Sequence, residues 1–284
     1  MSVSAKSLLS TLSVRGPHRV LRGNLGIAGQ PGVVFTPESG LDLPAVAFAH
    51  GWLTSADNYK GLLEHIASWG FVVAAPDTER GPIPSHLDLG ADLLTTVDIV
   101  TKVRLGDGTL SVRPDRVALA GHGMGAGAAV IAAAQRRVAA VVALFPAPTS
   151  PSAEGIAPEL DTPGLILAGG DLDSANSDAR ALAAAWSGPS FLRTIDGATN
   201  TDIIEGRRLF AALGAGRYNH KTDKTTRALV TGYLLSTLLG DKKYAAFTDP
   251  ETDFPHTTVV DPTAEVEPET PKLSIGTVAK LIRG

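Results

Sequence analysis

The chain has 284 residues, of which 44% are hydrophobic and 19% are charged, the balance of a globular protein with a sizeable core. A formal net charge of −4 argues against nucleic acid or an anionic membrane as a partner. The absence of cysteine excludes disulfides, thiolate chemistry and cysteine-based metal sites. No secretory signal pattern and no run near the ~18 apolar residues of a membrane span are present, so we expect a cytoplasmic protein.

Short apolar segments alternate with helical patterns along the chain. Strand-forming pieces broken by Gly and Pro between residues 20 and 35 predict the edge strands of a hairpin. Runs without polar alternation predict strands that are covered on both faces, namely residues 43–50, 71–76, 115–121, 139–145, 164–168 and, as the last strand, 191–195. Apolar residues at helical spacing predict helices after Ser55, around 93–100, over 124–135, around 182–186 and over 225–239.

This order of elements predicts an α/β fold, a doubly wound and mostly parallel sheet with helices on both faces. Residues 147–161 are too short to form a large cap domain. We expect a loose lead-in over residues 1–17 and one domain over 18–248. Proline and acidic residues then predict a disordered linker over 249–272, followed by an apolar and basic peptide over 273–284.

The central stretch is Gly121-His122-Gly123-Met124-Gly125, which lies between a predicted strand and a helix rich in alanine and glycine. This is the frame of a nucleophile elbow, G-x-S-x-G, in which a serine occupies a strained strand-to-helix turn. Here Gly123 occupies the position of that serine. Glycine has no side chain that could attack a carbonyl, and it tolerates the positive φ of such a turn.

Four segments in order resemble the α/β-hydrolases, and among them the cutinase and polyester-hydrolase group with its dienelactone-hydrolase-like relatives. They are His50-Gly51-Trp52 (oxyanion segment), 121–125 (elbow), 169–173 (acid loop) and 196–200 (the D-G-A-T-H segment). The resemblance implies that Asp173 is the triad acid, that Asn200 replaces the catalytic histidine and that Gly123 replaces the serine. It also implies oxyanion amides at Trp52 and Met124, which do not depend on side-chain identity.

A serine nucleophile needs a base within hydrogen-bond reach, and the base needs an acid that orients it. Asn200 cannot accept and return a proton near neutral pH, so Asp173 has no base to orient. We therefore expect a catalytically inactive hydrolase-fold protein that acts as a ligand-binding or protein-interaction module. The alternative hypothesis is a carboxylic-ester hydrolase, or another enzyme, that uses a non-standard site in the same cleft.

The remaining candidates have a structural and a functional interpretation each. His122 and His50 are expected to shape their loops, with His122 beside the ligand pocket and Trp52 lining it. His220 is a candidate replacement base. Asp171 and Asp173 lack further ligands at metal-binding spacing, so neither a metal nor a cofactor is expected. The ligand expected in the pocket is small and apolar or ester-like.

The C-terminal peptide from Leu273 to Gly284 has two interpretations. Its apolar residues Ile275, Val278, Ala279 and Ile282 fall at helical spacing, which is typical of an amphipathic helix that docks on its own domain or on a partner. A proline-rich acidic linker followed by this peptide also resembles the short tails that direct cargo proteins into encapsulin shells.

Overall fold

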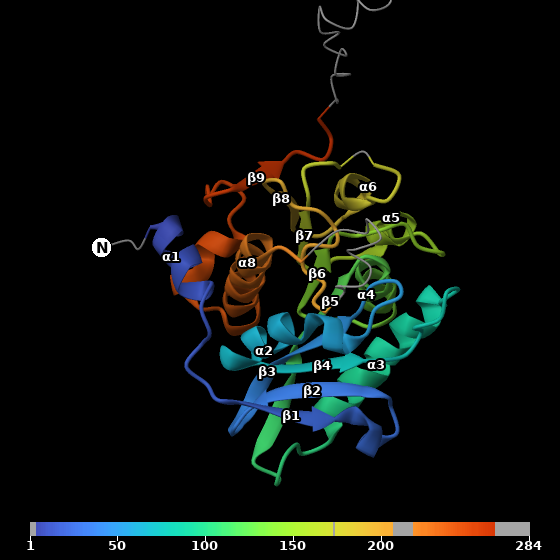
Figure 1. Cartoon of the computed structure of the whole chain (residues 1–284), viewed down its shortest axis with the longest axis vertical. Coiled ribbons are helices and arrows are strands. Elements are labelled where there is room, and N and C mark those ends of the chain that lie inside the picture. The colour runs from blue at the N-terminus through green and yellow to red at the C-terminus, as the bar shows by residue number, and fades with distance from the viewer. Residues whose placement is uncertain (1–3, 173, 207–217, 265–284) are drawn as a thin grey trace, which may run out of the picture.

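The structure is a computed structural model that describes residues 4–172, 174–206 and 218–264. A single sheet of nine strands runs through this part of the chain, in the order β1-β2-β4-β3-β5-β6-β7-β8-β9 (Figure 1). The strands from β4 to β8 in this order are parallel, whereas β1, β2 and β9 add antiparallel edges. The predicted α/β class with a mostly parallel sheet is confirmed.

The strands have the following bounds: β1 Val20–Asn24, β2 Gly32–Pro37, β3 Gly40–Ala49, β4 Val72–Pro76, β5 Leu110–His122, β6 Ala140–Leu144, β7 Gly164–Ala168, β8 Ser190–Ile195 and β9 Thr257–Val260. The helices are α1 Ala5–Leu12, α2 Lys60–Ser68, α3 His86–Lys102, α4 Met124–Gln135, α5 Ala153–Ile156, α6 Ala179–Ala185 and α8 His220–Leu239. Short 3₁₀ turns are η1 Leu25–Ala28, η2 Ala56–Tyr59, η3 Ala157–Glu159 and η4 Lys242–Thr248.

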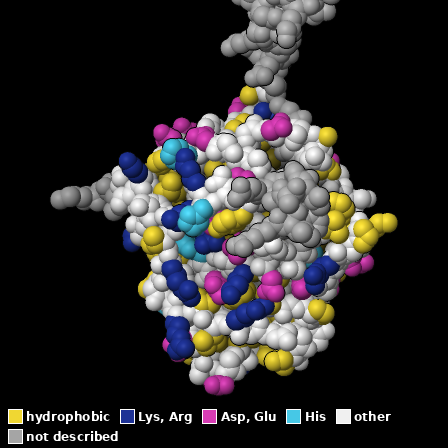
Figure 2. All heavy atoms as spheres, viewed as in Figure 1, with side chains coloured by type: hydrophobic (Ala, Val, Ile, Leu, Met, Phe, Trp, Pro, Cys, Tyr) yellow, Lys and Arg dark blue, Asp and Glu magenta, His cyan; other side chains and the backbone are white. Residues whose placement is uncertain are grey.

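Strands β4, β6 and β7 are buried at every position, because helices cover both faces of the sheet. One apolar cluster joins the sheet to α1, α2 and α8, and a second joins it to α3, α4 and α6 (Figure 1). Over residues 147–161 only α5 and η3 form, so this segment builds no large cap. On the face shown in Figure 2, side chains of both charges are interspersed.

The N-terminal segment is more ordered than the expected lead-in over residues 1–17. Ser4 caps α1, since its side chain accepts a hydrogen bond from the amide of Ser7. Leu8 and Leu12 are buried, and α1 packs against α8. The prediction failed because two leucines four residues apart are too short a pattern to distinguish a docked helix from a loose end.

The expected disordered linker over 249–272 also differs from the structure in its first part. Residues 257–260 form β9, which pairs antiparallel with β8, so 191–195 is not the last strand. Arg193 of β8, which is 2% exposed, donates hydrogen bonds to Thr257 Oγ1 and the carbonyl of Thr252 in this segment, both at 2.9 Å. Composition alone could not reveal that a buried cation on another strand binds this acidic segment.

The predicted C-terminal peptide 273–284 lies outside the described residues. No helix in residues 4–172, 174–206 and 218–264 is both long and apolar enough to cross a bilayer.

Candidate functional site

The predicted elbow is the turn between β5 and α4. Gly123 has φ 58° and ψ −120°, so its backbone lies in a region that costs a residue with a side chain of order 1–3 kcal/mol. A Cβ atom built at this position would have Gly51 Cα as its nearest neighbour, 3.8 Å away. The turn therefore keeps the backbone geometry of an elbow, and there is open space where a side chain would lie.

The two outer glycines of the frame are required by packing. A Cβ on Gly121 would overlap the carbonyl oxygen of Gly125, and a Cβ on Gly125 would overlap that of Ala49. Small residues here let α4 begin directly against β3 and β5. The N-terminal amide of α4, at Met124, is thereby placed at the base of the site.

A chain of hydrogen bonds connects the oxyanion segment to the loop after β8. The amide of Gly51 donates to Tyr59 Oη (3.1 Å), which lies 2.8 Å from His122 Nδ1, and His122 Nε2 lies 2.7 Å from the carbonyl oxygen of Asn200. Since that carbonyl can only accept, Nε2 is the donor, and in the neutral ring Nδ1 accepts from the Tyr59 hydroxyl. His122 is buried, and both of its ring nitrogens are engaged, which agrees with the structural interpretation.

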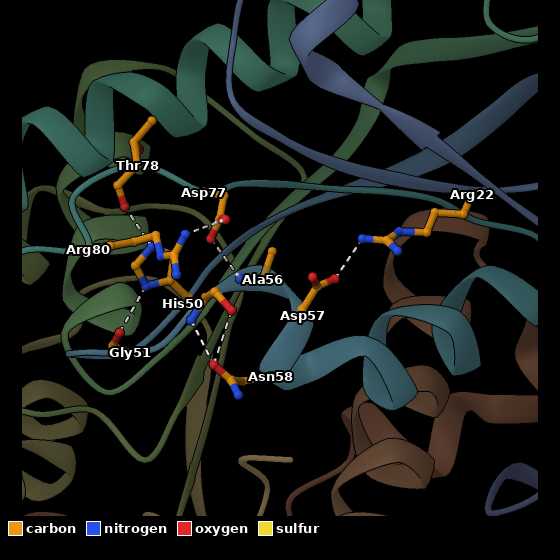
Figure 3. A network of polar contacts seen from close by, with 10 residues as sticks. Arg22, His50, Gly51, Ala56, Asp57, Asn58, Asp77, Thr78 and Arg80 are labelled. Atoms are coloured by element: carbon orange, nitrogen blue, oxygen red, sulfur yellow. Dashed lines mark hydrogen bonds and ion pairs between the residues drawn. The ribbon is translucent and has the colours of Figure 1, made fainter. Parts of the chain in front are cut away.

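The oxyanion segment after β3 is fixed by further polar contacts. The buried His50 ring lies between the carbonyl oxygens of Gly51 (2.9 Å) and Thr78 (2.7 Å), as Figure 3 shows. Thr54 Oγ1 also donates to the Gly51 carbonyl, at 2.7 Å. Trp52 is 56% exposed and donates from Nε1 to the carbonyl of Pro82, 3.0 Å away.

Asp77, which follows β4, supports the same region. Its carboxylate accepts one hydrogen bond from the amide of Ala56 at the start of η2 and one from the guanidinium of Arg80, both at 3.1 Å (Figure 3). These contacts bind the loop after β4 to the turn that provides Tyr59. Tyr59 could not be singled out by sequence reasoning, because its partner His122 lies 63 residues away.

The segment that contains Asn200 is held by its neighbours. The Asp202 carboxylate accepts hydrogen bonds from the hydroxyls of Thr199 (2.6 Å) and Thr222 (2.8 Å). The amide of Glu205 donates to the carbonyl of Asn58, at 2.8 Å. The backbone of position 200 is thus fixed by η2 and α8, whereas the Asn200 side chain is exposed and has no hydrogen-bond partner among the described residues.

A cavity of about 730 Å³ opens over the elbow, and we call it the main cavity. Its apolar lining comes from Trp52, Pro82, Ile83, Pro84, Met124, Ala147, Pro148 and Ile204. Its polar lining comes from Ser85, His86, His122, Ser150, Asn176, Asn200 and Thr201, with Gly51 and Gly123 at the backbone. An apolar surface with a few polar groups is typical of small-molecule sites.

The predicted residues Trp52, His122, Gly123, Met124 and Asn200 therefore meet at one cavity. The predicted acid, Asp173, lies outside the described residues. The candidate base His220 begins α8, is exposed and does not line the main cavity. Sequence reasoning missed Asn176 and Ile83, which lie on loops with no pattern that indicates a binding role.

A serine mechanism would need a serine hydroxyl beside a histidine ring, and the lining contains two serines, Ser85 and Ser150, near His86. Ser150 contacts His86 through its backbone amide, which donates to His86 Nδ1 at 3.0 Å. Ser85 Oγ accepts the amide of Asp88 and caps α3. No serine hydroxyl in residues 4–172, 174–206 and 218–264 is hydrogen-bonded to a histidine ring.

This part of the chain also contains no group of three His, Asp or Glu residues that could hold a metal ion.

The sheet order and the elbow define a protein of the α/β-hydrolase fold. A family model described as Chlorophyllase matches residues 23–159, a range that includes the oxyanion segment and the elbow. The chain is also 29% identical over 117 residues to "Chlorophyllase type 0" of Chenopodium album. That alignment covers 38% of this chain and 33% of the plant protein, so it spans about a third of that relative.

Both matches support assignment of the chain to the α/β-hydrolase superfamily. The matched family is not the cutinase and polyester-hydrolase group that the motifs resemble, and this finer assignment stays a prediction. The model's match ends at residue 159, before the positions of the predicted acid and base.

Proposed function

We propose that the protein binds a small apolar ligand with an ester-like or carboxylic head group, and that it does not catalyse acyl transfer by a serine mechanism. The observation that supports this most is the main cavity, about 730 Å³, which opens over Gly123 in an elbow of retained geometry. Gly123 provides no nucleophile and Asn200 no proton acceptor, so neither half of the serine mechanism is available.

The lining suggests how such a ligand is held. Trp52, Ile83 and Ile204 offer apolar surface to the body of the ligand. The amides of Trp52 and Met124 are the backbone donors that the resemblance assigns to an oxyanion hole, and they suit a carbonyl or carboxylate oxygen. The proposed ligand therefore points its carbonyl at the elbow and its chain along the cavity.

Ligand binding is tested by thermal unfolding of the full chain with octanoate and methyl octanoate. We expect the melting temperature to rise with ligand concentration, since a ligand that binds the folded state alone stabilises it by about 2.7 kcal/mol at one hundred times its dissociation constant. Ala147→Phe narrows the main cavity and should abolish the shift. Ala134 lines a separate cavity beside Pro163, so Ala134→Phe should leave the ligand-induced shift in melting temperature intact. No shift with either ligand in the unmodified protein contradicts the binding role.

Catalytic inactivity is tested separately. The purified protein should not react with a fluorophosphonate probe and should not hydrolyse short-chain p-nitrophenyl esters above the buffer rate. Probe labelling that disappears when one serine is replaced would overturn this half of the proposal.

A second candidate function is a carboxylic-ester hydrolase with a non-standard site. The observation that favours it is the match to a hydrolase family over the oxyanion segment and the elbow. Ser85 and Ser150 are the serines that line the main cavity in the described residues. Ester turnover that is lost in Ser85→Ala or Ser150→Ala, and kept in Ser39→Ala at an exposed position away from both cavities, would establish this alternative.

A protein-interaction role for the peptide 273–284 is a separate proposal that follows from the sequence. Deletion of the peptide should remove a co-purifying partner or shell particle and leave the melting temperature of the domain unchanged. Identical co-purification with and without the peptide would exclude this role.

A further inference from the structure

A second, smaller cavity of about 250 Å³ adjoins the main cavity, and we call it the side cavity. Asn176 and Asn200 line both cavities, so the two cavities border the same two residues. The rest of its lining comes from Phe145, Pro146, Ala168, Gly169, Asp171, Ser174, Ser177, Ala198 and Thr199. The side cavity thus lies between the loops that follow β6, β7 and β8.

The two asparagines at this junction offer unused hydrogen-bonding groups. Both side chains are exposed, and neither carboxamide has a hydrogen-bond partner among the described residues. Each carboxamide provides two N–H donors and one acceptor oxygen. Because His122 binds the Asn200 backbone carbonyl and not its side chain, the Asn200 carboxamide can turn toward a ligand without disturbing the loop.

The lining of the side cavity also restricts the charge of its occupant. Asp171, Ser174 and Ser177 line this space, and no Lys, Arg or His is among its described lining residues. An anionic group would lack a cationic partner there and would lie near a carboxylate. A neutral group with several hydrogen-bonding atoms matches these donors and acceptors.

We propose that the two cavities together bind one amphipathic molecule, an acyl ester of a neutral polyol such as glycerol. The acyl chain lies in the main cavity, the ester carbonyl at the elbow amides, and the hydroxyl-bearing head in the side cavity beside Asn176 and Asn200. This inference rests on the proposed function, to which it adds the class of ligand.

Isothermal titration calorimetry of the full chain with 1-monooctanoylglycerol and methyl octanoate, both below their aggregation concentrations, tests the inference. A net hydrogen bond of about 1 kcal/mol corresponds to about a fivefold change in affinity, so the glycerol ester should bind about 5- to 25-fold more tightly than the methyl ester. Asn176→Ala and Asn200→Ala should each weaken the binding of the glycerol ester about fivefold more than that of methyl octanoate, so that the preference for the glycerol ester falls.

Ile83→Ala is the control, since Ile83 lines the main cavity only and is 93% exposed. It should weaken both esters equally. Equal affinity of the two esters in the unmodified protein, or asparagine variants that weaken both alike, overturns the inference and leaves the proposed ligand binding standing. Absence of binding by either ester means that the proposed function itself has failed. Unchanged melting temperatures of the variants establish that they are folded.

Discussion

At the scale of single residues, the identity of Gly123 agrees with the backbone geometry of its turn. A residue with a Cβ at φ 58° and ψ −120° is strained, and glycine removes that strain. Gly123→Ala should therefore destabilise the protein by about 1–3 kcal/mol, although the added methyl group meets no atom closer than 3.8 Å. Urea unfolding monitored by circular dichroism measures this change.

The matched control is Gly170→Ala. An added Cβ at Gly170 meets no atom within 4 Å, and its φ is outside the positive range. This variant should change the free energy of unfolding by less than about 0.5 kcal/mol or stabilise the protein slightly. Equal effects of the two substitutions would contradict the assignment of strain to the elbow.

A pair of acidic residues behind the cavity loops makes stability depend on pH. Burial, followed by the hydrogen bond with the Glu154 carboxyl, raises the pKa of Asp178 from 3.8 to about 7. Burial acts to raise the pKa of Glu154 as well, but its hydrogen bond with Asp178 lowers it. The amide of Asp178 donates to the carbonyl of Pro146, at 2.9 Å, so the pair adjoins a segment that lines the side cavity.

The direction of the pH effect follows from proton counting. Between pH 3.8 and about 7 the folded state keeps the Asp178 proton that the unfolded state has lost, so the contribution of this group to the free energy of unfolding falls as pH rises. Above about pH 7 its contribution is flat. In Asp178→Asn the carboxamide does not titrate and donates to Glu154 at every pH. The decrease in the free energy of unfolding with rising pH should therefore disappear.

Urea unfolding at several pH values between 4 and 8 measures the effect. The exposed variant Asp107→Asn should reproduce the pH profile of the unmodified protein. If Asp178→Asn does the same, the Asp178 carboxyl is not the group that titrates.

At the scale of elements, the edge strand β9 and the segment before it contact one buried cation, Arg193. Besides its two hydrogen bonds, the Arg193 guanidinium lies 5.1 Å from the centre of the Phe254 ring and 5.9 Å from that of Phe191. Burial lowers the pKa of Arg193. Arg193→Met keeps an apolar stem but removes the charge-assisted hydrogen bonds, and should cost about 3 kcal/mol.

Hydrogen exchange measured by mass spectrometry should show faster exchange of the β9 amides in this variant. The amides of β5, β6 and β7 should keep the same ranking of protection against exchange as in the unmodified protein. Arg104→Met, at an exposed position, should leave both stability and exchange unchanged. Unaltered β9 protection in Arg193→Met would show that strand pairing alone suffices.

The docked helix α1 is the other element that composition did not predict. Leu12 is fully buried, and α1 packs on α8, the longest helix of the described residues. Leu12→Ala should destabilise the protein by about 3 kcal/mol in chemical denaturation, a typical cost for truncation of a buried leucine. Val14→Ala, at a residue that is 57% exposed, serves as the control and should have little effect. A small effect at Leu12 would mean that α1 is not part of the cooperative fold.

At the scale of the whole molecule, the sheet places the elbow, the oxyanion segment and position 200 around one cavity. If the geometry of a hydrolase site is retained, Gly123→Ser combined with Asn200→His should produce p-nitrophenyl ester hydrolysis well above either single variant. Measurement of the initial rates of the three variants provides the test. Equal, buffer-level rates for all three would show that the retained backbone does not suffice for catalysis.

The sequence allowed the sheet, its helices and the elbow to be predicted, because local patterns determine them. Long apolar runs indicated β4 and β6, and the glycine frame indicated the turn at Gly123. Features made by distant residues were not predictable in this way. The contacts of Tyr59 with His122 and of Arg193 with Thr257 join residues more than sixty positions apart, and the side cavity exists only where three loops meet.

The hydrogen bond from His122 to Asn200 ends on a main-chain oxygen, which every amino acid possesses. A substitution at position 200 therefore keeps the acceptor of this hydrogen bond, whatever the chemistry of the new side chain. A change of chemistry at this site then requires no remodelling of the chain trace.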